Sequence, residues 1–271
     1  MLKKFLGLCA ILTLATSCSD ISENDRLIEM DTVKPVRSIV IEDFTGQTCV
    51  NCPDAHTVLE ALVEQYGEDY VIPVSIHAGS FGMAAANSNY DKGNIWLMQP
   101  EGNQIQDAYG SINSWPIGVV NGRGGFANLD AWAKATRIEL LRESEASVSV
   151  IPDYDPATGT IEIETIIHPY ADIQGKLKVW VIESGIVARQ RNTEGWITDY
   201  RHDNVWRASA SALEGDAVSL ENGKTFTMKH TIAVRDSEKE RWNTENLSVV
   251  AILGNSSGYI NAQRRAVQRV N

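Results

Sequence analysis

Residues 41–53, IEDFTGQTCVNCP, decide the fold of this chain. The apolar run at residues 39–44 predicts a strand, and the glycine-containing GQT that follows it predicts a turn. Two cysteines two residues apart come next, Cys49 and Cys52, and a helical pattern of apolar residues begins directly after them. The order strand, turn, Cys-x-x-Cys, helix is typical of a redox-active cysteine pair rather than of half a zinc site.

The predicted chemistry follows from the helix that begins at this pair. Unpaired backbone N–H groups and the helix dipole stabilise a thiolate at a helix N-terminus, so we expect a lowered pKa for Cys49. Cys52 lies deeper and would be the resolving thiol that closes a disulfide. Two other interpretations stay open: a permanent structural disulfide, and a remnant of an ancestral oxidoreductase.

Two further features resemble the thioredoxin superfamily. Asp43 stands six positions before Cys49, where that superfamily has a buried acid that handles the proton of the resolving thiol. The run SWPIGVVNG at residues 114–122 resembles its cis-proline loop, which implies that Pro116 orients a substrate strand and that Trp115 lies beside the substrate. Thr48 departs from the pattern, because the superfamily usually has Trp directly before the first cysteine.

A narrower resemblance comes from the runs FTGQTCVNCP (residues 44–53) and WPIGVVN (residues 115–121). Both are similar to the outer-membrane-protein-28-related lipoproteins, which are cell-envelope proteins with a thioredoxin-like domain. The matching motifs cover about residues 39–141 well and the rest of the chain weakly.

The N-terminus predicts export. A basic start and a short apolar stretch indicate a signal peptide at residues 1–17. Cys18 follows small residues as in a bacterial lipobox, so we expect a lipid on Cys18 and an outer-membrane location; an ordinary cleaved signal peptide is the alternative. Residues 18–34 are polar and acidic and read as a flexible tether.

Composition narrows the range of partners. The formal charge of −11 disfavours nucleic acid and anionic lipid headgroups, so contact with the membrane would come through the lipid on Cys18. The four cysteines include Cys9, which leaves with the signal peptide, so the pair at Cys49 and Cys52 is too little for a disulfide scaffold. Nothing in the sequence indicates an oligomeric state.

The folded region is expected to have two domains. Residues 35–143 would form an α/β thioredoxin-like domain with a helical insertion at about 78–113. It would end in a helix at residues 129–142, with Trp132, Ala135, Ile138 and Leu141 directed inward. From residue 144 to 271 apolar residues alternate at period two, which favours an antiparallel β-sandwich.

One connection in the second half, residues 188–216, is long and rich in Trp, Arg and His. Its segment YRHDNVWR, at residues 200–207, gathers polar and aromatic side chains. It is either a loop that reads a ligand or a packed loop that locks the two halves together.

Two histidines, His77 and His56, are candidates for the neighbourhood of the cysteine pair. His77 ends a predicted strand at the edge where this fold gathers its chemistry, so we assign it to substrate binding with Trp115. His56, one turn after Cys52, is expected to be exposed or capping. With the cysteines these imidazoles could form a soft metal site, but the spacing matches no usual ligand pattern, so neither a metal nor a cofactor is predicted.

The preferred function is thiol–disulfide exchange with the thiols or disulfides of exported proteins. In it Cys49 attacks, Cys52 resolves, Asp43 relays the proton and Pro116 orients the substrate. The alternative is a non-catalytic surface or binding lipoprotein whose disulfide is structural. The sequence does not set the direction of electron flow.

Overall fold

A computed structural model describes residues 37–237 and 239–270. The predicted signal peptide, Cys18 and the whole of the predicted tether lie outside these residues. Among the helices in the described part, none is long and apolar enough to cross a membrane.

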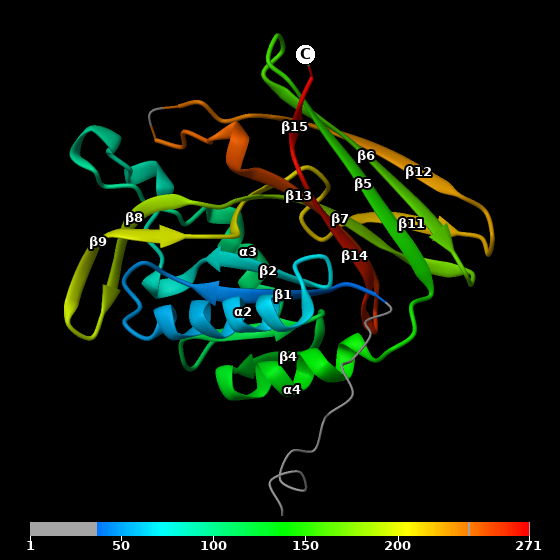
Figure 1. Cartoon of the computed structure of the whole chain (residues 1–271), viewed down its shortest axis with the longest axis horizontal. Helices are drawn as coiled ribbons and strands as arrows, with labels where there is room; N and C mark the ends of the chain where they lie inside the picture. Colours follow the sequence, from blue (N-terminus) through cyan, green and yellow to red (C-terminus); the bar gives the residue numbers. More distant parts are fainter. Residues whose placement is uncertain (1–36, 238, 271) are drawn as a thin grey trace, which may run out of the picture. The chain divides into compact units, whose positions relative to one another are not determined.

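A large mixed sheet organises the structure (Figure 1). Its strand order is β14-β13-β7-β10-β2-β1-β3-β4, and β11 pairs with the outer part of β7. Four of its strands come from the first half of the chain: β1 (Ile39–Thr45), β2 (Val71–His77), β3 (Ile117–Val120) and β4 (Arg123–Asn128). Five come from the second half: β7 (Ile173–Glu183), β10 (Val205–Ser209), β11 (Asp216–Leu220), β13 (Leu247–Asn255) and β14 (Gly258–Ala266).

Helices cover both faces of the first-half strands. β1 and β2 are parallel, so the chain must cross over between them, and α2 (Cys52–Tyr66) makes that crossover. α2 and α4 (Leu129–Leu140) pack on one face, and Figure 1 shows them on the same side of the sheet. α3 (Pro100–Asp107) packs on the opposite face through Ile105.

The alternation of β1 sorts its side chains between these two faces. Ile39 and Ile41 pack against α2, whereas Val40 and Phe44 belong to the core on the other side. Asp43 therefore faces α2, and its neighbour Glu42 faces away from it, where the Tyr259 hydroxyl donates to Glu42 Oε1 at 2.5 Å.

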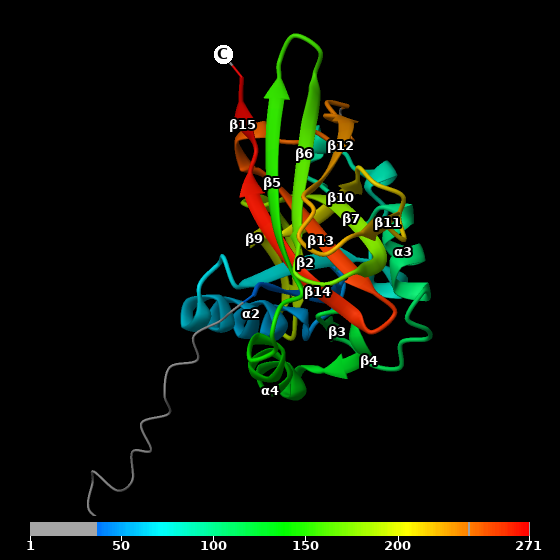
Figure 2. The same cartoon turned by 90° about the vertical axis from the view of Figure 1, so that its right-hand side faces the viewer.

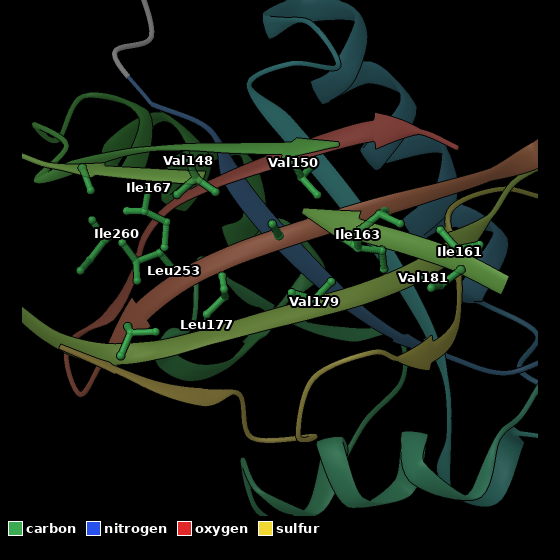
Figure 3. Packing of buried hydrophobic residues seen from close by; sticks show 14 of the residues in the cluster. Val148, Val150, Ile161, Ile163, Ile167, Leu177, Val179, Val181, Leu253 and Ile260 are labelled. Carbon is green, nitrogen blue, oxygen red and sulfur yellow. The ribbon is translucent and has the colours of Figure 1, made fainter. Parts of the chain in front are cut away.

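A second, four-stranded sheet packs against the large one. Its order is β12 (Phe226–Ala233), β6 (Thr160–Pro169), β5 (Ala146–Asp155) and β15 (Gln268–Arg269). Figure 2 shows the long β5–β6 hairpin standing beside β13 and β14. In Figure 3 its apolar side chains, such as Val148 and Ile163, point toward Val179 and Leu253 of the large sheet.

The described residues on both sides of the predicted 143/144 boundary belong to one compact unit and share the large sheet. The junction is between β2 and β10, where Ser75 pairs with Val205. The prediction of a self-contained sandwich in residues 144–271 therefore needs a correction. Two β-layers do pack face to face there, but one of them continues the sheet that begins at β1.

Some of the observed elements also differ in detail from the predicted ones. The insertion at 78–113 contains three short 3-10 turns, η1 (Gly79–Phe81), η2 (Ala85–Asn87) and η3 (Tyr90–Lys92), before α3. α4 buries Trp132 as expected, but Ile138 and Leu141 are 47% and 58% exposed, so the inward assignment of these two was wrong. A further 3-10 turn, η4 (Thr244–Asn246), precedes β13.

The predicted long connection at 188–216 is largely strand. It holds most of a two-stranded hairpin, β8 (Ile186–Asn192) and β9 (Gly195–His202), followed by β10. Two of its tryptophans have opposite surroundings: Trp206 is buried in the core, and Trp196 on the hairpin is 43% exposed.

Candidate functional site

The two cysteines form a disulfide at the start of α2. Cys52 is the first helical residue, and the Cα atoms of Cys49 and Cys52 are 5.5 Å apart. Cys49 lies in the preceding turn, where its N–H donates to the Gly46 carbonyl at 3.0 Å. Both are buried, at 2% and 0% exposure. The expected contrast between an exposed Cys49 and a deeper Cys52 is therefore absent in the oxidised structure.

The segment that precedes α3 covers the cysteine turn from one side. The Phe81 carbonyl accepts hydrogen bonds from the N–H and the Oγ1 of Thr48, at 3.1 and 2.9 Å. Gly46 lies so close to the Phe81 backbone that a Cβ at this position would collide with it. Thr48 thus fastens the turn to this segment.

The β8–β9 hairpin covers the turn from another side. Gln190 Nε2 donates to the carbonyls of Cys49 and Gly46, at 2.9 and 3.3 Å. In the other direction, Gln47 Nε2 donates to the carbonyls of Arg189 and Ile95, both at 2.9 Å. We call residues 79–98 and the β8–β9 hairpin together the cap.

Asp43 lies beneath the first turns of α2 and is completely buried. Parallel pairing sets it beside Ser75, whose Oγ donates to Asp43 Oδ2 at 3.5 Å. His56 Nε2 is 3.6 Å from the same oxygen, and Oδ1 has no hydrogen-bond partner within the described residues. Because burial disfavours the charged form and only Ser75 opposes this, the pKa of Asp43 is raised to about 8.

Three histidines form a cluster beginning at Asp43: His56 is partly buried, and His77 and His202 are buried. The His202 ring centroid is 5.5 Å from that of His77 and 6.3 Å from that of His56. The Tyr200 hydroxyl lies 2.6 Å from His56 Nδ1. Burial lowers the pKa of His56 to about 4 and that of His202 to about 3, and it lowers the pKa of His77 well below its ordinary value.

These positions differ from several expectations. The side chain of His56 is only 16% exposed and faces Asp43, so the expectation of an exposed residue was wrong. His77 is 3% exposed and faces His202. Trp115, joined to Pro116 by a cis peptide bond, packs edge-on against Phe81 of the cap with ring centroids 5.6 Å apart. The assigned roles of His77, Trp115 and Pro116 stay predictions.

Sequence reasoning missed Tyr200, His202 and Gln190 as parts of the site. The run at 200–207 is rich in polar and aromatic side chains, but nothing in it indicates which helix it contacts. More than 140 residues separate Tyr200 from His56 and Gln190 from Cys49.

An open cavity of about 420 Å³ is lined in part by His56. Among its lining residues are the two that approach Asp43, Ser75 and His56, together with charged side chains from α2, β9 and β14. Within the described ranges no group of three His, Cys, Asp or Glu side chains is arranged to hold a metal ion. The site thus combines a buried disulfide, a buried acid whose pKa is raised to about 8, and a cavity lined by the two side chains that approach that acid.

Comparison with solved structures supports the fold. HBP35 of Porphyromonas gingivalis matches 86% of this chain and 76% of its own with a TM-score of 0.65 at 16% identity. Protein AGR_C_4864 of Agrobacterium tumefaciens matches 88% of this chain and 98% of its own with a TM-score of 0.50, also at 16% identity. At such identity the likeness concerns the fold alone. None of the curated proteins searched matches the chain significantly.

Comparison with protein families matches residues 102–270 to the family described as outer membrane protein Omp28. The match starts within α3 and runs to the end of β15, through the half where the sequence motifs were weak. The chain therefore belongs to the Omp28 family of outer membrane proteins.

Proposed function

We propose that this Omp28-family protein exchanges thiols and disulfides with exported proteins through Cys49 and Cys52. The observation that carries the proposal is the environment of Asp43. A fully buried carboxyl with a pKa near 8 lies under the helix that starts at Cys52, and a group of this kind can take up and return a thiol proton near neutral pH.

The surrounding fold supports a thioredoxin-like site. A parallel β1–β2 pair joined by α2, followed by the antiparallel strands β3 and β4, sets the cysteine turn beside the Trp115–Pro116 segment through Phe81. The backbone N–H groups and dipole of α2 would stabilise a Cys49 thiolate once the disulfide is open.

The proposed reaction balances as follows. In the reduced protein the Cys49 thiolate attacks a substrate disulfide, forms a mixed disulfide and releases one substrate thiolate. The Asp43 carboxylate takes the proton of the Cys52 thiol, and the resulting thiolate attacks Cys49 Sγ. The substrate leaves as its second thiolate, and the Cys49–Cys52 disulfide is restored. Pro116 would align the substrate backbone, with Trp115 and His77 shaping the space around it.

Anchoring is part of the same proposal. A lipid on Cys18 would hold the chain at the outer membrane, because several acyl chains bind a bilayer firmly where one binds weakly. Membership of a family described as outer membrane protein supports this location.

A second candidate function is a binding lipoprotein with a structural disulfide. Burial favours it, because Cys49 and Cys52 are 2% and 0% exposed and Gln190 ties the cap to the Cys49 carbonyl. Exchange with a protein substrate requires the cap to move away from the cysteine turn.

The reduction potential separates the two functions. The protein is equilibrated with thiol buffers of known potential, and its free thiols are counted by alkylation and mass spectrometry. Exchange predicts a potential between about −120 and −270 mV, and a value below about −300 mV would indicate a structural disulfide.

The rate of reduction of the disulfide then tests whether the cap limits access to the cysteine turn. Gln190→Ala removes the side-chain hydrogen bonds to Cys49 and Gly46 and should speed reduction by a thiol. Gln174→Ala, which alters an exposed side chain paired with Ser219, is the matched control and should leave the rate unchanged.

A further inference from the structure

His56 stands between a buried acid and an open cavity. Its Nε2 is 3.6 Å from Asp43 Oδ2, and its Nδ1 is 2.6 Å from the hydroxyl of Tyr200, a partly exposed residue of β9. The imidazole also lines the 420 Å³ cavity. A neutral imidazole can accept a proton at one nitrogen while it donates from the other, so this placement suits proton transfer.

Asp43 needs such an intermediary because it has no contact with solvent. Its exposure is 0%, and the two side chains that approach Oδ2 are Ser75 and His56, which both line the cavity. Asp43 gives a proton to Cys52 during reduction and takes one during oxidation, so it returns to its starting protonation state within each half-reaction only by exchange with solvent. Of these two neighbours, His56 has the second nitrogen needed to pass a proton onward.

We propose that His56 is the positioning residue that carries the proton between Asp43 and the solvent in the adjoining cavity, with the Tyr200 hydroxyl as its outer partner. This inference rests on the proposed thiol–disulfide exchange.

The proton balance follows from the tautomer that the contacts favour. When the Tyr200 O–H donates to Nδ1, the proton of His56 is on Nε2 and faces Asp43. During reduction of the disulfide, Cys52 leaves as a thiolate and takes the Asp43 proton. Asp43 regains a proton from His56 Nε2, and Nδ1 takes the proton of the Tyr200 hydroxyl, which is restored by a proton from cavity water. During oxidation every transfer runs in reverse.

Burial keeps His56 neutral, against the pull of the carboxylates around it. Facing it are Asp43 of β1, His77 of β2, the α2 carboxylates Glu60 and Glu64, Tyr200, Arg201 and His202 of β9, Asp203 after β9, and Arg264 of β14. Burial lowers the pKa of His56 to about 4, and Asp203 opposes this shift. His56 is therefore neutral across the range in which Asp43, with a pKa of about 8, gains or loses its proton.

The test compares the protein with its His56→Ala variant during reduction by dithiothreitol, from about pH 6 to about pH 9, a range that brackets the Asp43 pKa. Reactions are stopped with acid, and alkylated thiols are counted by mass spectrometry. At any one pH dithiothreitol ionises identically in the wild-type and variant reactions, so the ratio of the two rates at that pH isolates the protein's contribution.

We expect His56→Ala to slow reduction about tenfold, less than the loss of a direct general base because His56 acts through Asp43. Added imidazole should restore the rate, because the deletion opens a space into the cavity. His168→Ala, which changes an exposed histidine on β6, should keep the wild-type rate and ignore imidazole. A merely structural role for His56 would give no imidazole rescue.

The outcomes separate the two proposals. If wild-type protein is reduced but His56→Ala keeps its rate, the role of His56 is overturned and exchange stands. If the wild-type disulfide resists reduction, both are overturned. Should circular dichroism show that His56→Ala is unfolded, His56→Gln takes its place. It fills the space, so we expect the same slowing without imidazole rescue, and an unchanged rate would overturn the inference.

Discussion

Glu139 and Asp43 are two buried carboxyl groups with opposite surroundings. Glu139, on α4, is 5% exposed at its side chain, and both of its oxygens are fully partnered. Its partners are Arg37 Nη2 at 2.6 Å, Arg142 Nε at 2.8 Å, Arg123 Nε at 2.9 Å and Asn121 Nδ2 at 3.0 Å. Asp43 has one oxygen without a partner in the described chain and no cation at hydrogen-bond distance from the other.

Because of this difference, Glu139 has a structural role, whereas Asp43 is suited to take part in a reaction. An ionised carboxylate surrounded by guanidinium groups gains most from staying charged, so Glu139 fastens the Arg37 end of the described chain to α4. A buried carboxyl without a cationic partner stays protonated to a higher pH, as the raised pKa of Asp43 reflects. Buried polar groups are usually hydrogen-bonded. The missing hydrogen bonds around Asp43 and its histidines therefore lower the stability of the fold at this place, which is typical of a functional site.

The largest expected effect is from Glu139→Gln. It leaves Arg37, with a side chain that is 2% exposed, beside Arg123 without a counter-charge, and removing one partner of a buried pair costs about 3–5 kcal/mol. Urea unfolding measures the loss, with the exposed neighbour Glu143→Gln as control. A loss equal to that of the control would remove the structural role assigned to Glu139.

Asp43→Asn should change how the free energy of unfolding depends on pH. The unfolded chain releases the Asp43 proton near its ordinary value of 3.8, whereas the folded chain holds it to about 8. Unfolding therefore releases a proton in this window, and the free energy of unfolding falls as pH rises, by up to about 1.4 kcal/mol per pH unit. Asp43→Asn should flatten this slope in urea unfolding, whereas Asp54→Asn, at an exposed acid of α2, should keep it. A wild-type slope in Asp43→Asn would contradict the raised pKa.

His202→Gln should change the pH dependence of the free energy of unfolding in the opposite direction. Burial lowers the pKa of His202 to about 3 from an ordinary 6.5, so between these values the unfolded chain binds the extra proton. Its contribution to stability is lost as pH falls through this window, by up to about 1.4 kcal/mol per pH unit. We expect His202→Gln to be less sensitive to acid in thermal unfolding. Equal sensitivity in His202→Gln and in the exposed control His168→Gln would argue against burial as the cause.

Arg142→Gln should have the smallest effect. Arg142 bonds Glu139 Oε1 but is 51% exposed, and exposed ion pairs contribute less than about 1 kcal/mol. Arg37→Gln, at the buried partner, should cost several times more in the same urea experiment. Equal losses of stability in the two variants would show that burial does not determine how much each arginine bonded to Glu139 contributes.

The sequence predicted the parts of the site that lie close together along the chain. Cys49, Cys52 and Asp43 fall within ten residues, so strand, turn and helix periodicity suffices to relate them. The period-two pattern after residue 144 likewise predicted strands, because alternation of apolar residues is a local property. It did not reveal that β7, β10, β13 and β14 extend the first sheet, because the pattern gives the type of an element but not its neighbour.

By itself, the sequence determined the cysteine pair at a helix start, the acid on the preceding strand and the family resemblance that the match to Omp28 confirms. Only the tertiary structure decided the cap, the histidine cluster and the raised pKa of Asp43. The physical reason is that burial and pKa depend on everything packed around a group, and Tyr200, His202 and Gln190 reach this site from more than 120 residues away.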